Sequence, residues 1–84
     1  MEKRLEVVRS IIDNCIDDLK VPITAVGNDA DLFDLGMDSI SSIKIVVELE
    51  REFDFEFEDE ELTMERLRTI NNILEYLAGK LGDI

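Results

Sequence analysis

Apolar residues recur at every third or fourth position near both ends of this sequence, and this spacing excludes most folds. Such spacing puts the apolar side chains on one side of an α-helix. The first series is Leu5, Val8, Ile12, Cys15 or Ile16, and Leu19, and the last is Ile70, Ile73, Leu74, Leu77 and Leu81. The sequence therefore predicts helices over about 3–19 and 70–81, each with one apolar side available for packing.

The chain has 84 residues, which is enough for one domain with one modest core. Because Cys15 is the only cysteine, no disulfide can brace that core, and helix packing has to supply the stability. We expect a single all-α domain over residues 1–84, built as a compact helical bundle. A lone cysteine and an N-terminus without the apolar block of a secretory signal favour a cytoplasmic location.

The charge balance narrows the choice of partners. With 21 Asp plus Glu against 9 Lys plus Arg, the net charge of −12 repels both nucleic acids and anionic lipid surfaces. No apolar run approaches the roughly 20 residues that cross a bilayer, so we expect no membrane insertion. An apolar content of 45% indicates a folded domain and not an acidic tail. Proteins with basic docking patches are the expected partners.

Pro22 should end the first helix near residue 20 because it disfavours helical geometry at Val21. The connection over 20–38 is long and apolar enough to pack across the bundle, with a short turn expected over 29–33. Residues 54–58 alternate like a strand, but without a partner strand they are predicted to form a loop. A short helix over about 63–67 follows, and Thr69 can cap the last helix.

The helix predicted over about 39–53 has two apolar stripes. Either Asp38 or Ser39 can cap its start, with Gly36 giving the sharp approach. At about 100° per residue, one stripe comprises Ile45, Val46, Leu49 and Phe53, and the other comprises Ile40, Ile43 and Val47. The first stripe runs to the helix end and is predicted to face the core. The second would then stay partly exposed as a docking surface beside Ser39, unless the helix lies between two others and both stripes are buried.

The residues Leu35-Gly36-Met37-Asp38-Ser39-Ile40 resemble the phosphopantetheine attachment motif of acyl and peptidyl carrier proteins. The resemblance continues through residues 47–53, the acidic run over 56–60 and residues 69–73, so it covers nearly the whole chain. It implies an up-and-down bundle of four helices, with a long first loop and a short third helix. The alternative for an isolated Asp-Ser pair is a helix cap without further function.

The resemblance also implies a function. A separate phosphopantetheinyl transferase would move 4'-phosphopantetheine from coenzyme A to the Ser39 hydroxyl, with Asp38 as cap and recognition residue and Gly36 as part of the motif. The chain, a monomer, would then carry acyl or aminoacyl cargo as a thioester to enzymes of fatty-acid, polyketide or related pathways. Those acyl-loading and acyl-processing enzymes would dock on a surface formed by Ile40, Ile43, Lys44, Val47, Glu48 and Glu50.

Two departures from the family pattern favour a specialised carrier. Lys44 is basic where many fatty-acid carriers are acidic, and the loop that carries Asp59 and Glu60 runs about two residues longer, through Thr63. A stand-alone aminoacyl or peptidyl carrier remains an alternative, as does an unmodified acidic adaptor that binds a basic partner through the second helix.

No catalytic or metal centre is predicted. The sequence contains no histidine, and Cys15 falls on an apolar stripe, where a buried core thiol is the better interpretation than a nucleophile. The acidic segment that begins at Asp29 fails the spacing of a calcium loop, because Asp34 occupies the position that requires glycine. The chain is therefore expected to be a carrier and not an enzyme.

Overall fold

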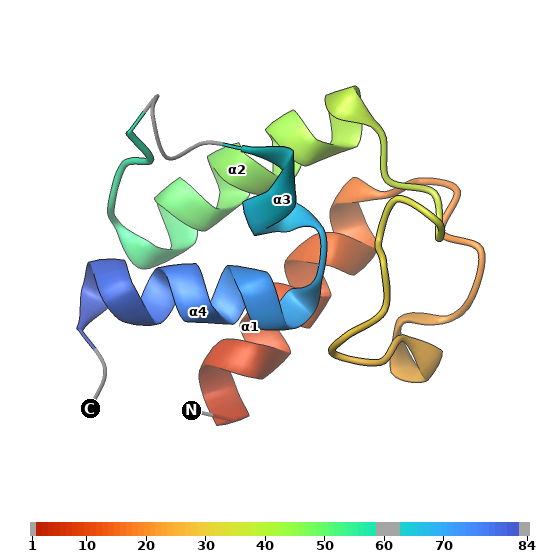
Figure 1. The fold of residues 1–84 in the computed structure, drawn as a ribbon, viewed down its shortest axis with the longest axis horizontal. Helices are drawn as coiled ribbons and strands as arrows, with labels where there is room; N and C mark the ends of the chain where they lie inside the picture. The colour runs from red at the N-terminus through yellow and green to blue at the C-terminus, as the bar shows by residue number, and fades with distance from the viewer. Residues whose placement is uncertain (1, 59–62, 83–84) are drawn as a thin grey trace.

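The computed structural model describes residues 2–58 and 63–82, without the side chains of residues 2, 3 and 64. Within these residues the chain forms four α-helices and a single 3-10 turn. The helices are α1 (Glu2–Cys15), α2 (Ser39–Phe53), α3 (Met64–Leu67) and α4 (Ile70–Leu81), and the turn is η1 (Ile23–Ala25). The predicted all-α bundle with a short third helix is confirmed (Figure 1).

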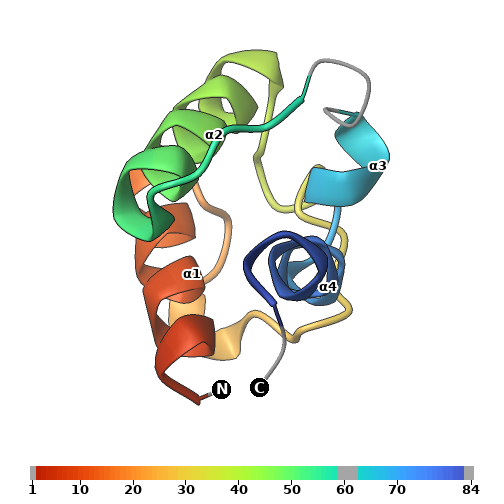
Figure 2. The same ribbon diagram turned by 90° about the vertical axis from the view of Figure 1, so that its left-hand side faces the viewer.

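Helix α1 contacts both α2 and α4, and α3 contacts α4. Viewed nearly along α4, α1 and α2 lie together on one side, whereas α3 lies on the other (Figure 2). The core between them contains fully buried side chains from all three long helices and from the first loop, among them Ile12, Leu32, Ile45, Leu49, Ile70 and Leu77. No described helix has the length and apolar content needed to span a membrane.

Helix α1 is shorter than the predicted 3–19, because it ends at Cys15. The N–H of Ile16 still donates to the Ile12 carbonyl at 3.0 Å, but the chain then turns away. Asp17 and Asp18 follow directly, and aspartate is both a poor helix former and unfavourable at the negative end of a helix dipole. Leu19 nevertheless packs against the core from the loop, which is why its apolar spacing extended the prediction.

The first loop is held together near its two ends by a close backbone approach. The N–H of Lys20 donates to the Leu35 carbonyl at 2.9 Å, so the two ends of the loop lie side by side. Gly36 has φ +121°, and a Cβ there would lie 2.8 Å from the Asp18 carbonyl oxygen. Only glycine avoids that clash, and the chain can therefore turn sharply into α2.

The segment after α2 has no helix or strand, as predicted for residues 54–58. Asp54 adopts a left-handed conformation that ends α2, with φ 54°. Phe57 then stacks on Tyr76 of α4, with ring centroids 4.8 Å apart and an interplanar angle of 2°. The longer acidic loop predicted around Asp59 and Glu60 lies outside the described residues.

Candidate functional site

A reciprocal capping box fixes the start of α2. Asp38, in extended conformation, is the N-cap, and its Oδ1 accepts the Ser41 N–H at 2.8 Å. In return, the Asp38 N–H donates to Ser41 Oγ at 2.8 Å. The pKa of Asp38 is lowered below its ordinary value. The main cause is the hydrogen bond from the Ser41 N–H, and the second is the hydrogen bond from the Ser41 hydroxyl. The sequence left open whether Asp38 or Ser39 caps this helix. The cap is Asp38, with an ionised carboxylate.

Ser39 is the first residue of α2, and its side chain is exposed. Its carbonyl accepts the Ser42 hydroxyl at 2.8 Å. Among the described residues its own hydroxyl has no hydrogen-bond partner, because the capping is carried out by Asp38 and Ser41. The positive end of the helix dipole lies at this residue, and that end favours an anionic group such as a phosphate. Ser39 thus offers a free hydroxyl at a position suited to a phosphate ester.

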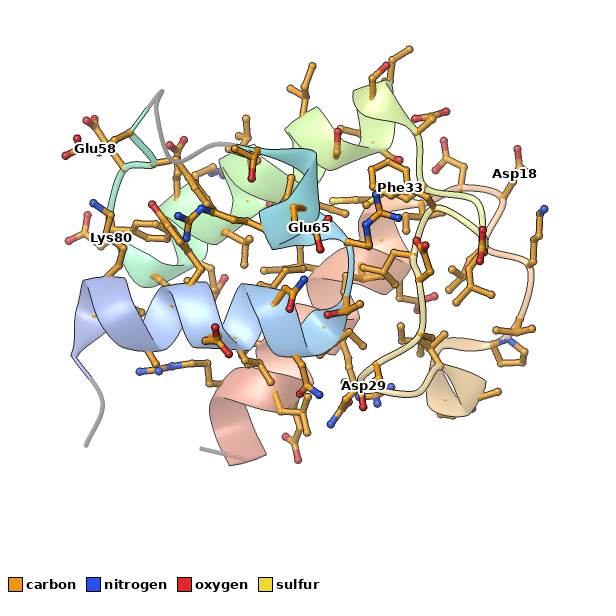
Figure 3. The ribbon with its side chains drawn as sticks, in the orientation of Figure 1. Asp18, Asp29, Phe33, Glu58, Glu65 and Lys80 are labelled. Atoms are coloured by element: carbon orange, nitrogen blue, oxygen red, sulfur yellow. The ribbon has the colours of Figure 1, made fainter. Side chains whose placement is uncertain are left out.

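The surface beside the start of α2 carries several acidic residues. A hollow of about 130 Å³ beside the start of α2 is lined by Cys15, Asp17, Asp18, Gly36, Asp38, Ile40, Ser41 and Lys44. Lys44 Nζ lies 3.9 Å from Asp17 Oδ2, and both side chains are largely exposed, so the pair is weak. Asp18 lies at the end of the molecule where α2 begins, whereas Glu58 and Lys80 lie at the opposite end (Figure 3).

The two apolar stripes of α2 have different environments, as predicted. Ile45 and Leu49 are fully buried, whereas Ile40, Ile43 and Val47 are 66%, 63% and 44% exposed. The alternative in which both stripes are buried is therefore wrong. The exposed stripe is the only set of large exposed apolar side chains in the part of the chain that the structure describes.

A groove of about 460 Å³ runs between α1 and α2 along the exposed stripe. Its lining combines Ile11, Asn14 and Cys15 of α1 with Ile43, Lys44, Val47 and Glu48 of α2. Five of the six predicted docking residues thus border the groove or the adjoining hollow. Glu50 does not, because its carboxylate accepts the Phe57 N–H at 2.9 Å on another side of α2.

Cys15 is buried, as predicted for a core cysteine. Burial is the main cause that raises the pKa of its thiol, and the nearby Glu48 carboxylate adds to it. A protonated, buried thiol is a poor nucleophile. Over residues 2–58 and 63–82, no three His, Cys, Asp or Glu residues come together in a way that could hold a metal ion.

Sequence reasoning missed six residues of this region: Ser41 and Ser42 beneath the helix start, Ile11 and Asn14 in the groove, and Asp17 and Asp18 in the hollow. The spacing of three residues between Asp38 and Ser41 matches a capping box and could have identified Ser41. The groove residues gave no such signal, because they are brought to α2 only by the packing of α1.

Comparison with known proteins gives two findings. A family model described as a phosphopantetheine attachment site matches residues 9–77. Two crystal structures of an engineered Bradyrhizobium japonicum glycine:[carrier protein] ligase, complexed with a carrier protein from Agrobacterium tumefaciens, are also similar. The structure with AMP matches at 27% identity and a TM-score of 0.80 over 84% of this chain and 93% of that chain. The structure with ATP matches at 27% identity and a TM-score of 0.77, over 84% of this chain and 91% of the matched chain.

Proposed function

Because this chain belongs to the family of proteins with a phosphopantetheine attachment site, we propose that Ser39 carries the phosphopantetheine arm and that the chain delivers cargo held on that arm. One observation carries the assignment to Ser39. Its hydroxyl is exposed and unpartnered among the described residues, at a helix start whose capping is already carried out by Asp38 and Ser41.

The residues present fit the group. Attachment joins Ser39 Oγ to the phosphorus of the pantetheine phosphate, breaks the bond from that phosphorus to the adenosine bisphosphate of coenzyme A, and releases the hydroxyl proton. The chain contains no histidine, and the neighbouring Asp38 carboxylate is engaged by Ser41, so we assign the proton to a base of the phosphopantetheinyl transferase. When bound, the arm supplies the thiol that holds cargo as a thioester. The chain itself contributes the hydroxyl and the positive end of the α2 dipole.

The surface beside Ser39 suits enzyme partners with a mixed apolar and basic contact region. Ile40, Ile43 and Val47 supply exposed apolar area, while Asp17, Asp18 and Asp38 attract basic groups. Lys44 and Glu48 border the same surface. We leave Glu50 outside this docking surface, because its carboxylate is engaged by the backbone after α2.

Two classes of cargo are candidates. The first is an acyl group of a fatty-acid, polyketide or related pathway. The second is an aminoacyl group on a stand-alone carrier, and the similarity to a carrier protein bound by a glycine:[carrier protein] ligase favours it. In both cases the enzyme that loads the cargo is a separate protein.

The test of attachment is an intact-mass measurement after incubation with coenzyme A and a broad-specificity phosphopantetheinyl transferase. We expect a gain of one phosphopantetheine on the wild type and on Ser10→Ala, which removes an exposed serine of α1, but none on Ser39→Ala. No gain on the wild type would favour the unmodified acidic adaptor. A gain that survives Ser39→Ala would place the arm elsewhere.

The test of cargo uses the modified protein with ATP, glycine and a glycine:[carrier protein] ligase. An aminoacyl carrier should gain one glycyl group only after the arm has been attached. If the ligase leaves the modified protein unchanged, while a fatty-acyl loading enzyme acylates it, the acyl class is correct.

A further inference from the structure

Two overlapping capping positions are available at the start of α2. Asp38 and Ser41 are three residues apart, and so are Ser39 and Ser42. Three residues is the spacing of a capping box, in which each side chain accepts the N–H of the other residue. The structure uses the first pair. In the second arrangement the Ser39 hydroxyl would accept the Ser42 N–H and would no longer be free.

The contacts of Ser41 favour the first arrangement. Its side chain is buried, and its Oγ accepts the Asp38 N–H at 2.8 Å. The single proton of this hydroxyl can be donated to Asp38 Oδ1, at 3.1 Å, or to the Asp38 carbonyl, at 3.2 Å. Every hydrogen bond of the Ser41 hydroxyl thus holds Asp38 in the capping position.

Ser42 already makes contacts near those that the second arrangement needs. It is fully buried, and its N–H donates to the Asp38 carbonyl at 2.9 Å, as the helix that begins at Ser39 requires. Its hydroxyl donates to the Ser39 carbonyl at 2.8 Å. If Ser39 became the cap, this N–H would turn to Ser39 Oγ, and the hydroxyl would accept the Ser39 N–H. Aspartate and serine are about equally good caps, so residue type alone does not decide between them.

We propose that Ser41 is a positioning residue for the attachment reaction: its hydroxyl holds Asp38 as the N-cap and thereby keeps the Ser39 hydroxyl from capping the helix itself. The inference rests on the proposed attachment at Ser39. Because Ser41 is buried, an enzyme that docks at the helix start does not need to touch it. The lowered pKa of Asp38, which the Ser41 N–H and hydroxyl cause, is consistent with this role.

The test compares kcat/KM for phosphopantetheine attachment between the wild type and Ser41→Ala. We expect a decrease of up to about fivefold, because the loss of one typical hydrogen bond shifts the ratio of the two arrangements about fivefold toward the one in which Ser39 caps the helix. Adding Ser42→Ala should recover part of the loss, because it removes one hydrogen bond of the competing capping box. Ser41→Thr keeps the hydroxyl and should stay near the wild-type value.

Thr69→Ala is the matched control, since it removes the side-chain cap of α4 while leaving α2 intact. It should lower stability with unchanged kcat/KM. In NMR titrations of the apo protein, Ser41→Ala should raise the pKa of Asp38 toward its ordinary value, and the Ser39 Cβ shift should change. Equal kcat/KM for wild type and Ser41→Ala, or an equal decrease in Thr69→Ala, would overturn the inference. Failure of the proposed function would instead leave the wild type unmodified.

Discussion

Helices α2 and α4 begin in nearly the same way, yet only one beginning can be a modification site. Both N-caps, Asp38 and Thr69, have φ −131° and extended geometry. Each side chain accepts the N–H of the residue three positions later, at 2.8 Å for Asp38 and 3.0 Å for Thr69. The next residue differs: Ser39 is exposed, whereas Ile70 is fully buried.

The supports of the two caps differ as well. The Ser41 hydroxyl accepts the Asp38 N–H in return. At the corresponding position of α4, the Asn72 side chain donates instead to the Glu65 carbonyl at 2.8 Å. Loop atoms also cover the start of α4, because the Asn71 N–H donates to the Asn28 carbonyl at 2.9 Å. A cap alone therefore does not identify a site. What identifies it is an exposed first residue whose functional group the cap leaves free.

Among the variants that distinguish the two helix starts, the largest loss of stability should come from a substitution at Ile70, the first residue of α4. Ile70→Ala removes a fully buried side chain and should lower the free energy of unfolding by about 2–5 kcal/mol. Urea unfolding followed by far-UV circular dichroism measures it. A loss no larger than that of Ser39→Ala would contradict the distinction drawn between the two helix starts.

The cap of α4 should have an intermediate effect. Thr69→Ala leaves the Asn72 N–H without its side-chain acceptor and should cost about 1 kcal/mol. The same unfolding experiment applies, with Thr69→Ser as a control that keeps the hydroxyl and should lose less. If both variants were equally destabilised, the methyl group and not the cap would be responsible.

Acidification should act on the α2 cap and spare the α4 cap. The pKa of Asp38 is lowered in the folded protein, so its contribution to stability is present above its ordinary pKa and is lost as the pH falls through the folded value. The effect should be smaller than that of Thr69→Ala, since a protonated carboxyl still has an oxygen that can accept the Ser41 N–H. Carboxyl NMR titration should give a pKa for Asp38 below 3.8, and a value above that would refute the ionised cap.

The smallest effect is expected at the proposed attachment residue. Ser39→Ala should change the free energy of unfolding by at most about 0.5 kcal/mol, because the side chain makes no contact that the helix needs and alanine is the better helix former. Parallel urea titrations with the wild type measure it. A loss above about 1 kcal/mol would mean that Ser39 has a structural role.

Much of the fold was predictable because helix formation depends on neighbours along the chain. The predicted bounds of α2, α3 and α4 agree with the structure within a residue or two, and Thr69 was correctly identified as a cap. The motif around Asp38 and Ser39 led to the family that the comparison with known proteins supports. The end of α1 was wrong, because Leu19 keeps the apolar spacing after the helix has stopped.

Of the candidate site, the sequence alone determined the residue types and their spacing: a glycine, an acidic cap and a serine at the start of a helix, with an apolar stripe beside them. These properties follow from short-range geometry. Only the tertiary structure decided which stripe of α2 is exposed and where Glu50 points. The first depends on how α1 packs against α2, and the second on the Phe57 N–H beyond the end of the helix, and no local pattern encodes either contact.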